Sequence, residues 1–424
     1  MADAFVERFV IEPTRSGPLR GTSFAVKDLF DVAGRPTGCG NPTWRATHPV
    51  PDTSAEVVLR LLGAGARLIG KTRTDELAYS FEGRNFHEGA PRNPAAPDRL
   101  TGGSSSGSAS AVAAAEVDFA IGTDTAGSVR VPAAWCGLFG IRPTHGRVPV
   151  GGLTALAPSF DTVGWFARST ALMRVIGTVL FGDDAKPIAP ARSLAPAQRH
   201  ARAQLAPGSL LRDRSVESRA DASGSAALDR VFEREGLNAG ALGEVSLQLD
   251  LTAAAECLRV LQGAEVWRTH GHWIETHHPE FGPGVAERFE ATRALTDAQV
   301  RAAALERTAI GARLDAVLPP GRMLCLPAVP GPAPRRDASA EEMQAQRRRL
   351  LPLTALASLT GRPQMTLPLL LGDSTPQGDS APQSFSLLGW RHGDEALLAM
   401  AELLCPSSGA GRDENQADMR IRPS

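Results

Sequence analysis

The 424-residue chain lacks several features that mark specialised classes of protein. Its 45 lysines and arginines nearly balance its 46 acidic residues, which argues against a binder of nucleic acid or of a membrane surface. Its five cysteines are dispersed without a C-x-x-C pair, which excludes a disulfide framework or a zinc ribbon as the organising feature. Because the chain has neither a run of about 18 apolar residues nor an N-terminal signal core, we expect a cytoplasmic protein without a transmembrane helix.

Lysine is also scarce, since only three of the 45 basic residues are lysines. Arginine keeps its proton in proteins whereas a desolvated lysine can lose it, so each lysine in this arginine-rich chain is informative. Lys27 follows the apolar residues Ala25 and Val26. We expect burial to lower the pKa of Lys27 toward neutral pH, where its amine can act as a base. The alternative is a structural ion pair with Asp28 or Asp31.

The order of the expected elements predicts a layered α/β fold in one domain. Strands are expected over 22–26, 67–70, 117–121, 323–327, 364–368 and 384–388. A capping box formed by Thr53 and Glu56 predicts one helix, and further helices are expected over 108–115, most of 252–314 and up to about 404. We expect one domain over 1–405, with a variable surface insertion at about 183–250 and a disordered tail at 406–424.

Two glycine turns carry the clearest chemical signal, at 102–108 and 122–130. If Ser128 in the second turn is a nucleophile, the backbone N–H groups of Thr125, Ala126, Gly127 and Ser128 form a natural oxyanion hole. A turn with a helix-capping serine, or a site for an anion, is the alternative interpretation. Neither turn has the Gly-Lys-Ser/Thr that a Walker-type phosphate loop needs.

The first turn also fits the G-x-S-x-G pattern of α/β-hydrolases, with Ser105 as nucleophile. That motif requires a strand immediately before it, and residues 97–101 are a poor strand. Its triad would also need a late histidine, and His392 is the only one after residue 278. The α/β-hydrolase interpretation is therefore the weaker alternative.

Together, the lysine segment and both turns resemble the amidase signature family. Its pattern is a strand ending in Lys-Asp, then Gly-Gly-Ser-Ser-Gly-Gly, then Gly-Thr-Asp-Thr-Gly-Gly-Ser-Ile-Arg. Ser104 and Ser128 keep the family's offset of 24 residues. The resemblance is densest over 19–170 and returns over 354–368 and in the final strand and helix. Segments such as 24–28, 40–42, 90–94 and 159–166 resemble the plant amidase-1 branch, which includes indole-3-acetamide hydrolases.

The resemblance implies a single amidase domain whose central, mixed, twisted sheet is covered by helices on both faces. It implies that Ser128 is the acylated nucleophile, that Ser104 is the bridging serine after a cis peptide bond, and that Lys27 is the terminal base. The backbone near Ala78 would line the acyl-binding channel, with Tyr79 at its border. The family pattern implies no metal and no cofactor.

The chain departs from the family pattern at two positions, because Ser106 and Ala126 stand where the common pattern has glycine. If position 126 needs a positive φ angle, alanine is strained there. Asp124 and Arg130 are expected to hold the second turn by hydrogen bonds. We expect Lys71 to pair with Asp75 or Glu76.

Other reactive side chains receive structural interpretations. Cys136 reads as buried packing because no histidine stands beside it. The four histidines between 270 and 278 are expected to lie on the surface, since no second cluster completes a metal site. They are His270, His272, His277 and His278.

The sequence therefore predicts a serine hydrolase that cleaves the C–N bond of a small or medium carboxamide, through an acyl-enzyme on Ser128. The same tetrahedral chemistry would also cleave a carbamate or an aryl ester. The alternatives are a subunit of a transamidation complex, which passes ammonia to a partner protein, and a non-catalytic relative whose turn binds a ligand. The expected partner is the small-molecule amide or carbamate substrate, with no nucleic acid and no membrane, and a homodimer stays open.

Overall fold

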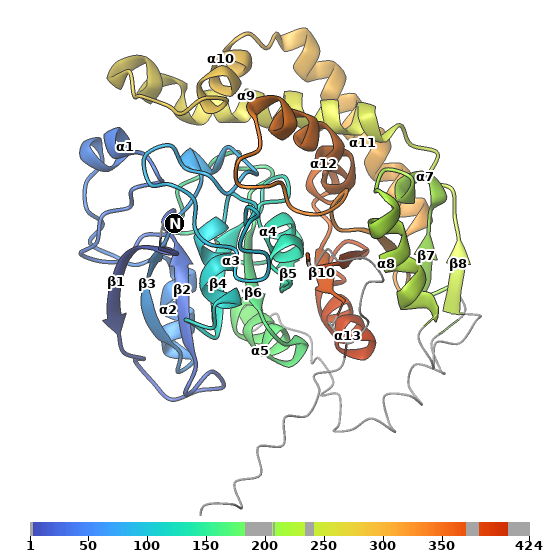
Figure 1. Cartoon of the computed structure of the whole chain (residues 1–424), viewed down its shortest axis with the longest axis horizontal. Helices are drawn as coiled ribbons and strands as arrows, with labels where there is room; N and C mark the ends of the chain where they lie inside the picture. Colours follow the sequence, from blue (N-terminus) through green and yellow to red (C-terminus); the bar gives the residue numbers. More distant parts are fainter. Residues whose placement is uncertain (1–2, 183–205, 207, 234–240, 370–380, 406–424) are drawn as a thin grey trace, which may run out of the picture.

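One large mixed β-sheet organises the chain (Figure 1). The computed structural model describes residues 3–182, 206, 208–233, 241–369 and 381–405. Within them, eleven strands form the sheet in the order β1-β3-β2-β4-β6-β5-β10-β11-β9-β7-β8. The strands are β1 Phe5–Ile11, β2 Ser23–Lys27, β3 Arg67–Thr72, β4 Phe119–Thr123, β5 Phe139–Arg142, β6 Val163–Ala167, β7 Leu210–Arg212, β8 Leu242–Glu244, β9 Met323–Pro327, β10 Gln364–Pro368 and β11 Ser384–Leu388.

The first part of the sheet places β2 between two parallel neighbours, β3 and β4. Successive side chains of a strand point to opposite faces, so Phe24 and Val26 lie on one face and Ala25 and Lys27 on the other. All four side chains are fully buried. The alternation therefore carries Lys27 into the interior on the face that helix α3 covers.

Helices cover both faces of the sheet. On one face, α2 (Glu56–Gly63), α5 (Thr170–Phe181) and α13 (Asp394–Leu404) pack together over a core that includes Phe24, Val26 and Trp165. On the other face, the small-residue helix α3 (Ser106–Ala113) and α4 (Arg130–Trp135) pack against Ala25, Ala120 and Phe166.

A group of longer helices lies beyond α4 and appears along the top of Figure 1. Helix α9 (Leu251–His277) contacts α10 (Val285–Arg293), α11 (Asp297–Val317) and α12 (Ala340–Thr360). The remaining short helices are α1 (Pro42–Thr47), the 3₁₀ turn η1 (Glu76–Ala78), α7 (Arg214–Glu217) and α8 (Ala222–Glu233). The group around α9 shares one large apolar core with η1 and α4.

The predicted α/β class, the mixed sheet and its helical cover on both faces are confirmed. The three late strands have the predicted bounds, and three helices fill most of 252–314. The capping box is wrong, because α2 begins after Ala55 and Thr53 does not cap it. Part of the insertion predicted at about 183–250, and the whole tail predicted at 406–424, lie outside the described residues.

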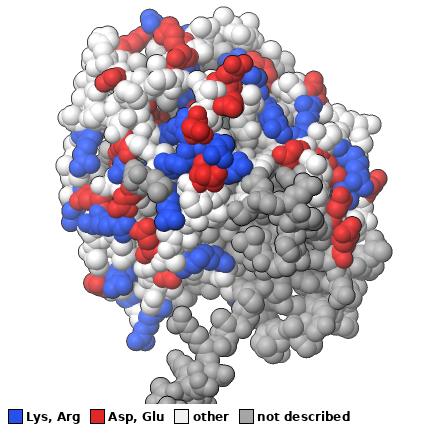
Figure 2. Space-filling model, in the orientation of Figure 1, with Lys and Arg blue, Asp and Glu red and all other residues white. Residues whose placement is uncertain are grey.

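The surface fits the balanced composition. Figure 2 shows a central group of basic side chains bordered by acidic ones, and both signs are scattered over the rest of that face. In the part of the chain that the structure describes, no helix is both long enough and apolar enough to cross a bilayer.

Candidate active site

Lys27 is the last residue of β2, and its amine lies in a buried hydroxyl environment. The Nζ atom is 2.7 Å from Ser104 Oγ and 2.8 Å from Thr123 Oγ1. The adjacent Asp28 instead pairs with Lys71, whose Nζ is 2.7 Å from Asp28 Oδ1. The ion-pair alternative for Lys27 is therefore wrong, because the aspartate next to it is used by another lysine.

Burial lowers the pKa of Lys27 to about 7, against the opposing influence of the Asp75, Asp124 and Asp161 carboxylates. A charged ammonium is costly where no water can solvate it, so the neutral amine becomes accessible near neutral pH. Lys27 can thus accept a proton from a neighbouring hydroxyl, which an arginine at this position could not do.

Ser104 lies in the first glycine turn, and the peptide bond between Gly103 and Ser104 is cis, as expected. The turn is held by its backbone, since Gly103 N–H donates to Phe81 O at 2.9 Å and Asp75 N–H donates to Ser104 O at 3.2 Å. Glycine is required at 103 because a Cβ atom there would lie 2.4 Å from Asp75 Oδ2. The close packing fixes Ser104 next to the amine of Lys27.

Ser128 lies between the end of β4 and the start of α4 and is almost fully buried. Its carbonyl accepts a hydrogen bond of 3.3 Å from the N–H of Ser105, so the backbones of the two glycine turns touch. The structure therefore brings together, in one buried region, the segments that carry Lys27, Ser104 and Ser128.

An aspartate–arginine cluster holds the second turn. The carboxylate of Asp124 accepts hydrogen bonds from the N–H groups of Gly127, Val129 and Arg130. The Arg130 side chain binds both of its oxygens, at 3.0 and 2.8 Å. Burial alone would raise the pKa of Asp124, but Arg130 and Arg142 hold it well below its usual range. Asp124 and Arg130 thus hold the turn as predicted.

The predicted oxyanion hole needs one correction. The N–H of Gly127 donates to Asp124 Oδ1 at 2.9 Å, so it is already used within the turn. The N–H groups of Thr125, Ala126 and Ser128 have no hydrogen-bond acceptor among the described residues. The positive φ of the turn falls on Gly127, at 132°, and not on Ala126. Alanine at 126 is therefore unstrained.

Ala78 lies in η1, directly after the Asp75 turn, and is buried. Both Leu77 and Ala78 have positive φ angles, of 45° and 59°, which non-glycine residues rarely adopt. Ala78 and Tyr79 belong to the same apolar core as Ala126 and Trp135. The predicted channel residue thus lies in the core that contains the Ser128 turn.

Several predicted residues have other roles. Ser105 Oγ is buried and exchanges hydrogen bonds with the backbone of Thr123, and no strand precedes it, so the α/β-hydrolase motif lacks its context. Lys71 pairs with Asp28, and the predicted pairing with Asp75 or Glu76 is wrong because Lys71 is in register with the β2 end. Cys136 is buried, as predicted.

The histidine segment is only partly on the surface. His272, His277 and His278 are exposed, but His270 is buried beside Trp44 and Phe289, so its surface prediction is wrong. Its side of α9 faces α1 and α10, and burial lowers its pKa to about 4. Among the described residues, no group of three or more histidine, cysteine or acidic side chains is arranged to hold a metal ion.

Sequence reasoning missed two residues of the site. Thr123 hydrogen-bonds Lys27, and Asp75 lies against Gly103 and is the largest of the charges that raise the pKa of Lys27. Burial itself raises the pKa of Asp75 to about 6. Thr123 stands inside the second motif and was within reach of the analysis. Asp75 carries no local signal, because only the fold brings it to Ser104.

The family model described as Amidase matches residues 10–398. The chain belongs to the amidase family. Amidase 1 of Arabidopsis thaliana is 41% identical over 420 residues, covering 95% of this chain and 97% of the relative. A solved structure described as a crystal structure of amidase superposes with a TM-score of 0.77 and 31% identity, over 92% of this chain and 85% of that one.

Relatives from transamidation match a smaller part of the chain. One of them, a component of the glutamyl-tRNA(Gln) amidotransferase of Natronomonas pharaonis, is 44% identical over 182 residues, which is 43% of each chain. The resemblance to the amidase family and its plant amidase-1 branch is therefore confirmed over nearly the whole chain, and the likeness to this amidotransferase component covers less than half.

Proposed function

We propose that this amidase is a serine hydrolase that cleaves the C–N bond of a small or medium carboxamide through an acyl-enzyme on Ser128. The observation that carries the proposal is the buried amine of Lys27, 2.7 Å from the hydroxyl of Ser104. Burial lowers the pKa of this amine to about 7, so a neutral base is available where the second glycine turn presents Ser128.

In the first step, Ser128 Oγ attacks the amide carbon and gives up its proton. Ser104 accepts that proton while its own proton passes to the neutral Nζ of Lys27, so the relay conserves charge. The tetrahedral intermediate then collapses, the C–N bond breaks, and the leaving nitrogen receives a proton from Lys27 through Ser104. Water hydrolyses the acyl-enzyme by the same relay and restores the free Ser128 hydroxyl.

The oxyanion would be bound by the free N–H groups of Thr125, Ala126 and Ser128, without Gly127. The Asp124 cluster fixes these donors before substrate arrives, so little reorganisation is needed in the transition state. Losing one such donor typically costs about 3–4 kcal/mol of barrier. Carbamates and aryl esters pass through the same tetrahedral geometry and are included in the proposed substrate range.

The test is a hydrolysis panel with indole-3-acetamide, benzamide, aliphatic amides, an anilide and an aryl carbamate. Ser128→Ala is expected to abolish turnover while thermal unfolding and circular dichroism stay unchanged. Ser105→Ala is the matched control in the adjacent turn and is expected to retain turnover. Loss of activity in Ser105→Ala with retention in Ser128→Ala would overturn the proposal in favour of the α/β-hydrolase interpretation.

A further inference from the structure

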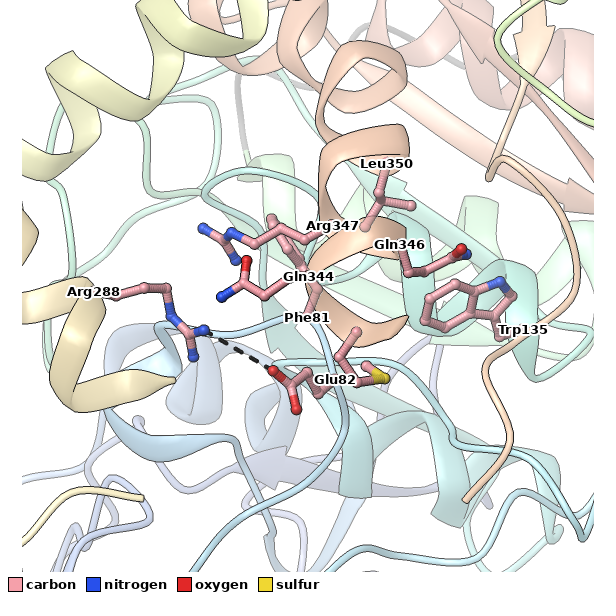
Figure 3. A pocket seen from close by; sticks show the side chains of 9 residues that line it. Phe81, Glu82, Trp135, Arg288, Gln344, Gln346, Arg347 and Leu350 are labelled. Atoms are coloured by element: carbon pink, nitrogen blue, oxygen red, sulfur yellow. Dashed lines mark ion pairs between the residues drawn. The ribbon is translucent and has the colours of Figure 1, made fainter. Parts of the chain in front are cut away.

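A small cavity lies beside the first glycine turn, between α12, α10, α4 and the segment 81–82 (Figure 3). Its volume is about 20 Å³, larger than the space that one water molecule needs, so it accommodates a small polar group. Aromatic and basic side chains line it. They include Phe81, Glu82, Trp135, Arg288, Arg347 and Leu350.

Arg347 is the unusual member of this cavity. In the part of the chain that the structure describes, its guanidinium has no hydrogen-bond acceptor and no ion-pair partner. Its guanidinium lies over the ring of Phe81, whose centroid is 4.9 Å from Cζ. Burial and the nearby Arg288 lower the pKa of Arg347 to about 10. A half-buried guanidinium without an anion is unfavourable, which suggests that a ligand completes it.

Arg288 brings a second guanidinium with a free donor. Its Nε donates to Tyr79 O at 2.9 Å, and its Nη1 lies 3.9 Å from Glu82 Oε1, the ion pair marked in Figure 3. Its Nη2 is buried and has no hydrogen-bond partner among the described residues. Two guanidinium groups thus face a single carboxylate, which leaves the cavity with an excess of one positive charge.

The cavity is connected to the catalytic turns from two sides. Phe81 O accepts the N–H of Gly103, and a Cβ atom at Gly102 would lie 2.5 Å from the Trp135 ring. On α12, Thr354 packs against Gly127, where a Cβ atom would lie 3.0 Å from its methyl group. Arg347 precedes Thr354 by two helical turns on the same face, about 10 Å along the helix axis.

We propose that this cavity binds a carboxylate at the far end of the substrate's acyl group, so that the preferred substrates are monoamides of dicarboxylic acids. The inference rests on the proposed hydrolysis at Ser128. One carboxylate balances the excess charge of Arg347, Arg288 and Glu82, and a guanidinium binds carboxylate oxygens with paired N–H donors. Phe81 and Trp135 supply the apolar wall along which the acyl chain reaches the cavity.

The experiment compares monoamides of the linear dicarboxylic acids, from glutaric to sebacic acid, with neutral amides of the same chain length. Wild-type protein is expected to favour the acidic substrate at one chain length. Arg347→Met should raise KM for that substrate about tenfold to a hundredfold, the range for a lost charged hydrogen bond, and leave kcat/KM for the neutral amide within about twofold. Arg348→Met removes an exposed arginine of the same helix and is the matched control.

Glu82→Gln gives a change of the opposite sign, because removing the one carboxylate should lower KM for the acidic substrate. If Arg347→Met fails to fold, Arg347→Gln keeps hydrogen-bond donors without the charge and is measured instead. Equal effects of Arg347→Met and Arg348→Met, or no preference of wild type for any acidic substrate, would overturn the inference.

A binding measurement separates this inference from the proposed function. Calorimetry with Ser128→Ala protein and the favoured monoamide is expected to show binding that Arg347→Met weakens at least about tenfold. Binding to Ser128→Ala without any amide hydrolysis by wild type would overturn the function and support the anion site. Ser128-dependent hydrolysis of neutral amides, without Arg347-dependent binding, would support the function and overturn the anion site.

Discussion

At the scale of single residues, the choice of lysine at position 27 decides the chemistry. Arginine replaces lysine almost everywhere else in this chain, yet the amine beside Ser104 must lose its proton to act as a base. The protein provides burial, which lowers the pKa of Lys27, and hydroxyl partners that accept hydrogen bonds from it. Asp75, Asp124 and Asp161 moderate the effect, so the pKa lies near neutral pH.

The first prediction concerns pH. Because neutral Lys27 is the base, kcat/KM should rise with pH and level off above an apparent pKa near 7. Lys27→Ala should lose this limb and about 10²- to 10⁴-fold in kcat/KM. Asp75→Asn should move the limb to lower pH, since the Asp75 carboxylate raises the pKa of Lys27. Near-normal rates of Lys27→Ala at pH 7 would contradict the assignment.

Residue-level interpretation from sequence succeeded where the motif was local. Lys27, Ser104 and Ser128 could be selected because each stands in a short segment of recognisable composition. The partner of Lys71 could not, because two acidic residues follow it closely in the chain while the one it contacts, Asp28, ends the neighbouring strand. Asp75 was missed for the same reason, since its contact with the Ser104 turn exists only after folding.

At the scale of elements, the second turn depends on one carboxylate. Asp124 fixes the backbone of the turn through three N–H groups and is surrounded by Arg130 and Arg142, all fully buried. The arginines also reach other elements, since Arg130 binds Gln364 on β10 and Ser358 on α12. The turn is therefore positioned by the sheet and by α12 together.

Asp124→Asn tests this arrangement. Asparagine keeps one acceptor oxygen but removes the charge, so two buried guanidinium groups lose their counter-ion. We expect the free energy of unfolding to fall by about 3–5 kcal/mol, measured by urea denaturation. Asp98→Asn breaks an exposed pair with Arg335 and should cost less than about 1 kcal/mol. Equal losses in the two variants would show that the turn does not need the Asp124 charge.

Element prediction from sequence was accurate for buried strands and weak at their edges. The strands at 323–327, 364–368 and 384–388 are short apolar runs with turn residues beside them, and their bounds were predicted. Strand β1 was missed because it mixes acidic, basic and apolar residues and is half-exposed at the edge of the sheet. The Thr53 capping box failed because backbone contacts of Ala55 and Glu56 with the loops at Asp31 and Gly151 fix the start of α2 instead.

At the scale of the whole molecule, the sheet assembles a site from distant parts of the sequence. Lys27 comes from β2, Ser128 from the end of β4, and Thr354 and Arg347 from α12, more than two hundred residues later. The sequence predicted the fold class and the region of the catalytic turns. The cavity at Arg347 could not be predicted, since its walls come from four separate elements.

The whole chain is expected to work without a partner protein. Family similarity covers residues 10–398, whereas the similarity to the amidotransferase component covers 43% of the chain. Purified protein should therefore hydrolyse amides at full rate, and its elution in size-exclusion chromatography should not change when cell extract is added. Activity that appears only with extract, together with a shift to larger size, would favour the transamidation alternative.

The most direct test of the central claim is to locate the covalent adduct of a fluorophosphonate probe by peptide mass spectrometry. The account predicts one adduct, on Ser128, which is absent in Ser128→Ala and strongly slowed in Lys27→Ala. Ser105→Ala should label like wild type. An adduct on Ser105, or hydrolysis of amides by protein that leaves Ser128 unlabelled, would contradict it.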